Sequence, residues 1–251
     1  MTNKKEIFAG IIVIGNEILS GRTQDTNTST LSIWLNSLGI KVQEVRTIPD
    51  LENIIISTVN ELRKKYNYIF TTGGIGPTHD DITADSVAKA FGVPIDYHPE
   101  AFDAFQQYFE AAGMEANDAR MRMARVPDGG LLIDDSVDFM PGFQMDNVFV
   151  LAGVPSVARR MFEGASKQLR RGQPMHSRSI RCNTGEGAIA DALSTIQQDF
   201  PNAEIGSYPW TENDHHGTTL VVRSTDRTTL DKVFDKVMDM STRLGGDPVE
   251  E

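Results

Sequence analysis

Short runs of β-branched residues alternate with amphipathic segments along the first third of the chain. Residues 7–14 are an apolar, β-branched run that predicts a buried strand, and the short apolar run at 68–72 and residues 40–45 predict two further strands. Between and after them, apolar residues recur at helical spacing and predict three helices. Their apolar stripes are Leu31, Trp34, Leu35 and Leu38, then Leu51, Ile54, Ile55, Val59 and Leu62, then Ala84, Val87, Ala88 and Phe91. This alternation predicts an α/β layer with a mostly parallel sheet.

The pattern continues less regularly as far as residue 170. A helix is predicted to begin at Pro99, with Phe102, Phe105 and Phe109 at core spacing, and a short helix follows over 117–124. Strands are predicted within 131–151, with a break at Pro141-Gly142 and a last strand at 148–151. A final helix is predicted from the turn at 152–156 through Arg170. They extend the same α/β layer.

The pattern changes after a predicted linker at 171–175. The predicted elements are a strand at 178–182, a helix with Ile189, Ala192, Leu193 and Ile196, strands around 204–209 and 218–224, and a helix with Leu230, Val233, Phe234 and Val237. This βαββα order predicts a small α+β domain. We therefore expect two domains, residues 1–170 and 177–251.

The composition of the chain limits which binding partners and which cellular compartment we expect for the protein. The net charge of −11 argues against a nucleic-acid binder or a protein of anionic membranes. Residues 177–251 hold seven Lys and Arg against thirteen Asp and Glu, which favours a structural or oligomerising module. The single Cys182 fits a reducing cytosol, and the apolar run at 9–14 is too short for a signal peptide or a membrane span. We expect a cytoplasmic protein.

The third predicted strand ends in a glycine-rich turn, and a helix begins near Thr83. Gly73, Gly74 and Gly76 permit positive φ and close approach of a ligand, and Pro77 stiffens the turn. The free N–H groups at a helix start suit phosphate. The spacing is neither that of a Walker loop nor that of a dinucleotide fingerprint. The turn therefore predicts an anionic ligand, and a tight connection without a ligand stays open as the alternative.

Four acidic side chains lie near the predicted strand ends. Asp80 and Asp81 follow the glycines and indicate a divalent cation between the protein and a phosphate. Asp50 precedes a predicted helix, and Glu17 follows the first strand. Because ligands gather at the carboxyl ends of strands in open α/β sheets, the loops after the first, third and last strands are expected to share one pocket. Helix capping by the aspartates and loop ion pairing by Glu17 remain alternatives.

Three motifs follow predicted strands: GNEILSG at 15–21 with DTN at 25–27, TGGIGPTHDDIT at 72–83, and GVPS at 153–156. Together they resemble the signatures of the competence-damage protein CinA family. The resemblance covers roughly residues 7–165, the molybdopterin-binding, MoaB/MogA-like domain that also occurs in gephyrin and in eukaryotic FAD synthase. The segment TGEGAIAD at 184–191 is similar to the KH-named domain that follows in CinA proteins.

This resemblance implies a three-layer fold, a sheet flanked by helices, whose three motifs converge on one pocket. Molybdenum-cofactor proteins of this fold bind the pterin and its phosphate there, whereas CinA-type members are associated with divalent-metal-dependent hydrolysis of ADP-ribose-like pyrophosphates and FAD synthase domains with FAD hydrolysis. The candidate catalytic residues are then Asp81, Asp80 and Asp50, and the candidate ligands of Mg²⁺, Mn²⁺ or Co²⁺ are Asp81, Asp80 and Glu17. The candidate residues for binding ligand or phosphate are Gly15, Asn16, Glu17, Asn27, Thr72, Gly73, Gly74, Gly76, Pro77, Thr78, Thr83, Gly153, Pro155 and Ser156.

The chain departs from the family in its third motif, which is usually Pro-Gly-Val-Pro-Ser-Glu. Ala152 replaces the first proline and Val157 replaces the glutamate. If that glutamate serves catalysis, turnover is weakened while the backbone around Gly153 still binds ligand. The chain also ends at Glu251 without the amidase domain of longer CinA proteins, so that activity is not expected.

The leading hypothesis is a nucleotide pyrophosphatase of the CinA type that acts on an ADP-ribose-like or FAD-like substrate. A molybdopterin-binding protein that carries or adenylylates the pterin is one alternative. A non-catalytic ligand-binding protein is the other. Relatives form dimers or trimers, so we expect a homo-oligomer.

Overall fold

The computed structural model describes residues 6–133 and 142–251. The chain divides into two compact units, one ending at Gly172 and the other comprising Gln173–Glu251. Each unit has its own hydrophobic cluster and is described separately. Within the described residues, no helix is both long and apolar enough to cross a bilayer.

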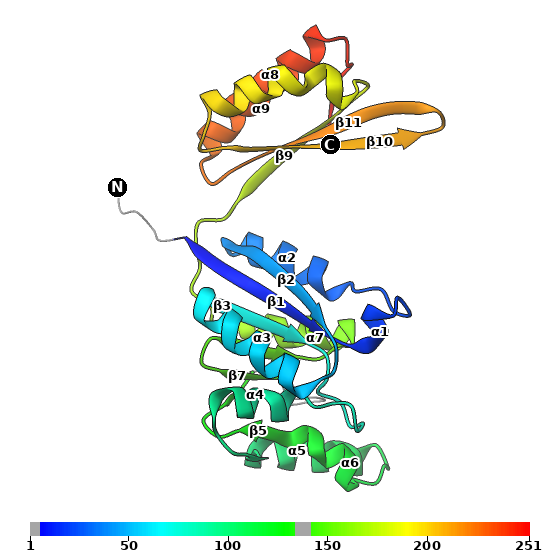
Figure 1. The fold of residues 1–251 in the computed structure, drawn as a ribbon, viewed down its shortest axis with the longest axis vertical. Coiled ribbons are helices and arrows are strands. Elements are labelled where there is room, and N and C mark those ends of the chain that lie inside the picture. Colours follow the sequence, from blue (N-terminus) through cyan, green and yellow to red (C-terminus); the bar gives the residue numbers. More distant parts are fainter. Residues whose placement is uncertain (1–5, 134–141) are drawn as a thin grey trace. The chain divides into compact units, whose positions relative to one another are not determined.

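The first unit is built on a six-stranded sheet with the order β2-β1-β3-β8-β7-β6 (Figure 1). Its strands are β1 (Ile7–Ile14), β2 (Ile40–Ile48), β3 (Tyr68–Thr72), β6 (Leu131–Leu132), β7 (Phe143–Met145) and β8 (Val148–Leu151). The pairs β1·β2, β1·β3 and β3·β8 are parallel, whereas β7 and β6 continue the sheet in antiparallel fashion. The predicted mostly parallel α/β sheet is confirmed.

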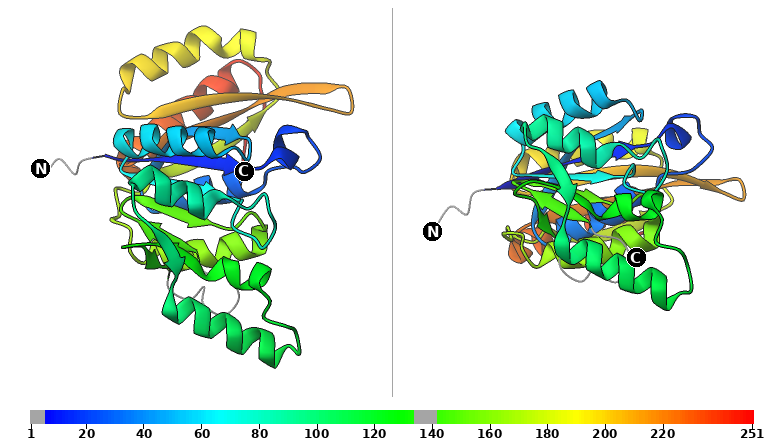
Figure 2. Two further views of the ribbon diagram at one scale, coloured as in Figure 1. Left: turned by 60° about the horizontal axis from the view of Figure 1, so that its bottom comes forward. Right: turned by 90° about the horizontal axis from the view of Figure 1, so that it is seen from below.

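Helices cover both faces of this sheet (Figure 2). They are α1 (Asn16–Leu19), α2 (Asn27–Ser37), α3 (Glu52–Lys65), α4 (Thr83–Phe91) and α7 (Pro155–Ser166). The pair α2 and α7 packs together through Trp34 and Phe162, whose rings stack at 4.9 Å, while α3 lies against α4. The buried apolar residues of strands and helices merge into one cluster between the layers, as the predicted stripes require.

A smaller lobe, residues 95–127, leaves the sheet after α4. It consists of β4 (Ile95–Tyr97), α5 (Pro99–Ala111), α6 (Asp118–Met121), a 3-10 turn (Arg122–Ala124) and β5 (Arg125–Pro127). Phe105 and Phe109 of α5 pack with Ala101, Met121 and Ala124 in a cluster of their own. The antiparallel pair β4·β5 closes the lobe and was not predicted, because each strand has only three residues and no alternating pattern.

The second unit is an antiparallel sheet with two helices packed against it. Its elements are β9 (His176–Cys182), α8 (Glu186–Asp199), β10 (Glu204–Glu212), β11 (His215–Ser224), α9 (Arg227–Arg243) and β12 (Val249–Glu250), with the strand order β10-β11-β9-β12. Alternate residues of β9 and β11, such as Ile180, Leu220 and Val222, meet Val233 and Phe234 of α9 in the core. The predicted βαββα order is confirmed, and β12 is an addition to it.

Some predicted details are wrong, and one lies outside the described residues. Strand β2 continues to Ile48 instead of ending at Val45, and Leu51, predicted in the apolar stripe of the next helix, precedes α3 and is 53% exposed. Helix α7 ends at Ser166 instead of continuing through Arg170. The chain tightens there into bonds between residues three apart, and the N–H of Arg170 donates to the hydroxyl of Tyr68 at 2.9 Å instead of continuing the helix. At the predicted break Pro141-Gly142, residue 141 is not among those described.

Candidate functional site

The four parallel strands bring four loops to one edge of the sheet. In the register of the sheet Ile14 pairs with Ile48, and Thr72 pairs with Leu151. Val13 also pairs with Thr72, so the strands end nearly level with one another. The loops that carry the three motifs therefore start side by side, at the edge where open α/β sheets bind ligands.

The second and third motifs touch through glycine backbone. The N–H of Gly73 donates to the carbonyl of Leu151 at 3.1 Å. A Cβ atom on Gly153 would lie 3.3 Å from the Cα of Gly73. Gly73 itself has φ of +101°, and a Cβ atom there would lie 2.1 Å from the carbonyl oxygen of Ile14. Only glycine fits position 73, and this close approach joins the loops after β1, β3 and β8.

Asn27 fastens the first motif to the third. Its side-chain Nδ2 donates to the carbonyl of Gly153 at 2.8 Å, and the residue is only 8% exposed. Its own backbone N–H donates to Asp25 Oδ1 at 2.9 Å, and that of Thr28 donates to the same oxygen at 3.2 Å. Asn27 therefore lies at the predicted site, but its side chain holds two loops together within the protein.

These loops enclose a pocket at the edge of the sheet, here called the rim pocket. It is lined by Val13, Ile14, Glu17, Ile18, Thr23, Gln24, Asp25, Thr26, Asn27, Thr72, Gly73, Gly153 and Pro155. Its volume is about 60 Å³, room for a few water molecules. Segments of all three motifs therefore contribute to one hollow.

A buried hydroxyl in the rim pocket has no partner in the described part of the chain. Thr72 is 1% exposed, and its Oγ1 makes no hydrogen bond to a described residue. A buried polar group without a partner costs free energy, so such groups in native proteins usually meet water or a ligand. The neighbouring Thr71 is equally buried and equally unpartnered, but it does not line the pocket.

The glycine loop, residues 73–82, is fastened at its end by Thr83. The hydroxyl of Thr83 donates to the carbonyl of Gly73 at 3.0 Å, and its N–H donates to the carbonyl of Gly74 at 2.9 Å. Gly74 has φ of +70°, and a Cβ atom there would lie 2.1 Å from Thr83 Oγ1. Thr83 is fully buried, so its polar groups hold the loop instead of facing a ligand.

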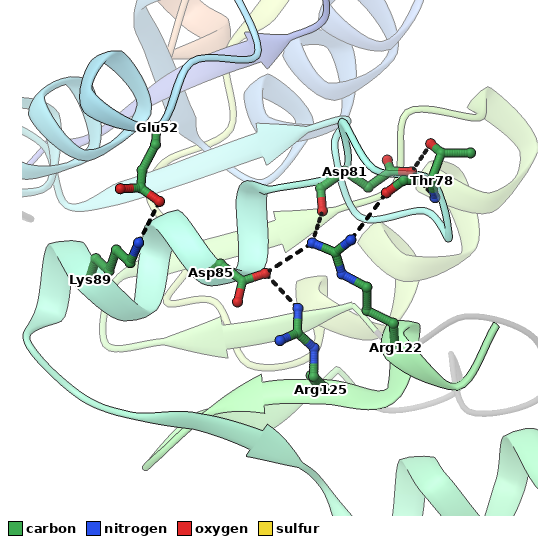
Figure 3. Close-up of polar contacts among 7 residues, drawn as sticks. All are labelled: Glu52, Thr78, Asp81, Asp85, Lys89, Arg122 and Arg125. Carbon is green, nitrogen blue, oxygen red and sulfur yellow. Dashed lines mark hydrogen bonds and ion pairs between the residues drawn. The ribbon is translucent and has the colours of Figure 1, made fainter. Parts of the chain in front are cut away.

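Asp81 closes the turn inside the glycine loop (Figure 3). Its Oδ2 accepts hydrogen bonds from the N–H of Thr78 at 2.8 Å and from the hydroxyl of Thr78 at 2.5 Å. Asp81 and Gly76 line a separate hollow of about 20 Å³, and Pro77 is exposed beside them. Asp80 is solvent-exposed, and a hydrogen bond from Thr78 lowers its pKa. Of these carboxylates, Asp80 is the one that remains open to solvent.

Asp50 and the first motif form a second contact between loops. Asp50 Oδ2 accepts from the N–H of Asn16 at 2.8 Å, and the N–H of Gly15 donates to the carbonyl of Ile48 at 3.1 Å. The N-cap of α3 is Leu51 and not Asp50, so the aspartate fixes the neighbouring loop. Glu17 follows in α1, exposed to solvent at the edge of the rim pocket.

The predicted metal ligands do not form one cluster. Glu17 lines the rim pocket, whereas Asp81 lines the separate hollow and has an oxygen engaged by Thr78. Among residues 6–133 and 142–251, no three His, Cys, Asp or Glu side chains are placed to hold an ion. The described side chains thus do not fit a metal held by the protein alone.

The departures in the third motif have structural counterparts. The N–H of Ala152, which a proline would lack, lies 3.2 Å from the sulfur of Met161. Val157 is 6% exposed and belongs to the main hydrophobic cluster, although Pro155 and Ser156 before it are exposed. A glutamate at 157 would have to place its carboxylate in or beside that cluster, and this chain has an apolar contact there instead.

Some residues at the site were not predicted as binding residues. Thr23, Gln24 and Asp25 line the rim pocket, and Arg122 and Arg125 contact the glycine loop and α4 from the lobe. Asp25 stands in the first motif, which was a usable signal. No spacing in the sequence connects the two arginines with a loop forty residues away.

Comparison with known proteins decides the family. Residues 10–171, well over half of the chain, match the model described as a probable molybdopterin binding domain. The chain belongs to the molybdopterin-binding domain family. In addition to this molybdopterin-binding domain, residues 174–244 match the model described as the middle domain of FAD synthase.

Relatives support the same assignment. A protein of Archaeoglobus fulgidus is 34% identical over 199 residues, covering 79% of this chain and 84% of the relative. A protein of Aeropyrum pernix is 32% identical over 261 residues, covering 97% of both. The structure of the protein CinA, of unknown function, from Thermoplasma acidophilum has a TM-score of 0.59 and 26% identity, and it covers 64% of this chain and 98% of its own. The CinA-like character of the molybdopterin-binding domain is confirmed.

Proposed function

We propose that this protein binds a phosphate-bearing nucleotide or pterin in the rim pocket and hydrolyses nucleotide pyrophosphates such as ADP-ribose or FAD. The observation that carries the binding proposal is the convergence of three loops on one hollow lined in part by Thr72, whose buried hydroxyl has no hydrogen-bond partner among the described residues. A hydroxyl donates one hydrogen bond and accepts others, so it suits the edge of a pterin or base, a ribose, or a phosphate oxygen. The family assignment and the match to FAD synthase support this class of ligand.

The charge of the pocket suggests which end of the ligand it receives. Two lining residues, Glu17 and Asp25, are acidic, and the described lining holds no Lys or Arg. Carboxylates accept hydrogen bonds from ring N–H and ribose O–H groups but repel bare phosphate. We therefore assign one hydrogen-bonding edge of the ring or sugar to this small pocket, with the rest of the ligand outside it and the phosphates beside the glycine loop.

The phosphates then need positive charge from a source other than the pocket wall. A divalent cation supplied with the ligand would provide it and would offset charge at the scissile bond. The described carboxylates form no preformed cluster, so the cation would arrive with the ligand, and its requirement is measured by adding and omitting it. Asp80, an exposed carboxylate of the glycine loop with a lowered pKa, is ionised at neutral pH and is free to meet such a complex from solvent.

A pair of isosteric variants tests the binding proposal. Thr72→Val removes the hydroxyl in the pocket, and Thr71→Val removes an equally buried, unpartnered hydroxyl outside it. Losing one hydrogen bond should weaken binding of FAD or ADP-ribose about tenfold in Thr72→Val, measured by calorimetry, and leave Thr71→Val at the wild-type affinity. Equal affinity of the two variants would remove Thr72 from the site.

Hydrolysis is tested separately from binding. The wild-type protein is incubated with ADP-ribose or FAD and with Mg²⁺, Mn²⁺ or Co²⁺, and AMP is measured by chromatography. We expect AMP only when the cation is present, and at least a hundredfold less with Asp81→Ala, because that change opens the turn of the glycine loop. Absence of AMP with every cation would reject the pyrophosphatase.

The buried position of Val157 favours a second candidate, a non-catalytic ligand-binding protein. Tight binding without AMP release would support it. Formation of an adenylylated pterin from ATP and a pterin would instead identify the third candidate, the molybdopterin-adenylylating protein.

A further inference from the structure

Arg122 stands at the junction between α6 and β5, where the lobe meets the glycine loop. Its neighbours Met121 and Ala124 are 5% and 0% exposed and lie in the cluster around Phe105 and Phe109. The backbone at Arg122 is therefore fixed by packing within the lobe. Its side chain leaves the lobe and is 32% exposed.

The guanidinium group of Arg122 reaches three oxygens near the loop (Figure 3). Nη1 donates to the carbonyl of Thr78 at 3.4 Å, and Nη2 donates to the carbonyl of Asp81 at 3.3 Å. Nη2 also lies 3.5 Å from Asp85 Oδ2, in the first turn of α4. Arg125 donates to the same carboxylate oxygen at 2.5 Å, so Asp85 joins both arginines.

These contacts bind both ends of one turn. Thr78 and Asp81 are already joined by the hydrogen bonds of the turn itself, and Arg122 holds their two carbonyls from outside. A planar guanidinium presents its donors from separate nitrogens in a fixed fork and can reach oxygens that lie apart, whereas an ammonium group has all three donors on one nitrogen. The side chains of Asp85 and Arg125 are each 23% exposed, so the charge cluster is only partly screened by solvent.

We infer that Arg122 is a positioning residue that holds the glycine loop, residues 73–82, in its ligand-receiving conformation from the lobe. It acts through the backbone carbonyls of Thr78 and Asp81 and not on a ligand. The loop's use in binding rests on the proposed function, whereas the bracing of the loop does not. None of the three motifs lies in the lobe, yet the lobe would then help to hold the site in shape.

Amide hydrogen exchange of the full chain tests the bracing. Peptides covering 74–83 report on the N–H groups of Thr78, Asp81 and Thr83, which donate within the loop. Arg122→Met keeps the aliphatic length of the side chain and removes every donor. The matched control is Lys89→Met, which breaks an ion pair at 2.5 Å between Lys89 of α4 and Glu52 of α3 without touching the loop.

We expect exchange in the loop peptides to become about tenfold faster in Arg122→Met and to stay at the wild-type rate in Lys89→Met. Arg122→Lys should fall between wild type and Arg122→Met, because one ammonium cannot span the three oxygens. If Arg122→Met does not fold, the exchange rates of Arg122→Lys test the bracing by themselves. Wild-type rates in the loop, or equal acceleration in every peptide of the first unit, would overturn the inference.

A second readout connects the brace to the ligand. If the wild type binds ADP-ribose, the dissociation constant of that complex should be about tenfold higher for Arg122→Met and unchanged for Lys89→Met. The unfolding midpoint of Arg122→Lys should equal that of the wild type. If the wild type binds neither ADP-ribose nor FAD, the proposed function fails, while the exchange result on Arg122 stands by itself.

Discussion

Several side chains at the candidate site serve the shape of the loops. The hydroxyl and the N–H of Thr83 donate to the carbonyls of Gly73 and Gly74, and the side-chain amide of Asn27 donates to the carbonyl of Gly153. Thr72, which lines the rim pocket, is the exception, since its buried hydroxyl has no hydrogen-bond partner within residues 6–133 and 142–251. At the scale of single residues, the site consists of a rigid backbone frame with few groups available for a ligand.

A substitution at Gly73 should show how tightly this frame is built. Gly73→Ala adds a Cβ atom 2.1 Å from the Ile14 carbonyl oxygen at a φ of +101°, whereas Gly92→Ala has a φ of +70° and open space around it. The left-handed backbone costs about 1 kcal/mol in both variants. The clash should raise the total for Gly73→Ala to about 3 kcal/mol or more.

Urea unfolding measures this difference in the first unit. The chain has two tryptophans, Trp34 and Trp210, so a Trp210→Phe background leaves Trp34 to report on that unit alone. Equal destabilisation by Gly73→Ala and Gly92→Ala would show that the loop shifts at little cost, contrary to the close packing described.

At the scale of elements, the edge strand β2 is tied to the end of α3 by a charged group. Glu44 accepts hydrogen bonds from Lys65 and from the hydroxyl of Tyr66, both at 2.7 Å, and from Arg46 on its own strand. The bond from Lys65 is the largest cause, with those from Tyr66 and Arg46 next, that lowers the pKa of Glu44 from 4.5 to about 2. Strand β2 is thereby held by the side-chain bonds of Glu44 at its middle as well as by its backbone hydrogen bonds to β1.

The stabilisation by Glu44 should depend on pH in a defined window. Because the pKa is lower in the folded chain, the contribution is complete above pH 4.5 and is lost as the pH falls toward about 2. Glu44→Gln should therefore lower the free energy of unfolding by about 1 kcal/mol at pH 7 and by almost nothing near pH 2. Urea titrations at four pH values, with the exposed Glu100→Gln as control, check this; a constant difference would contradict it.

The sequence predicted elements better than it predicted contacts. The continuous apolar runs of β1 and β3 and the helical periodicity of α3 and α9 were sufficient, because each pattern is strong within its own segment. The three-residue strands β4 and β5 are too short to show a period, and α7 stops at Ser166, where the hydrogen bonds change to residues three apart. The adjacency of the three loops followed from parallel topology, but the bracing by Arg122 depends on tertiary packing that no local pattern records.

At the scale of the whole molecule, two separate cores imply two folding units. Ile180, Leu220, Val233 and Phe234 bury one another within the second unit alone. Residues 173–251, expressed alone, should therefore unfold cooperatively, followed by the fluorescence of Trp210.

The lobe provides the contrast for that experiment. Residues 95–127 have a small core in which Ala101, Phe105, Phe109, Met121 and Ala124 are buried, and they should show no cooperative transition when expressed alone. A non-cooperative second unit, or a cooperative isolated lobe, would contradict this assignment.

The hydrogen bond between Asn27 and Gly153 joins positions 126 apart in the chain. A growing polypeptide therefore has no receptacle until the segment after β8 has been synthesised and has taken its place beside β3. Any small molecule that occupies the finished hollow would select completed chains over partial ones, so its supply would govern how much of this protein survives cellular quality control.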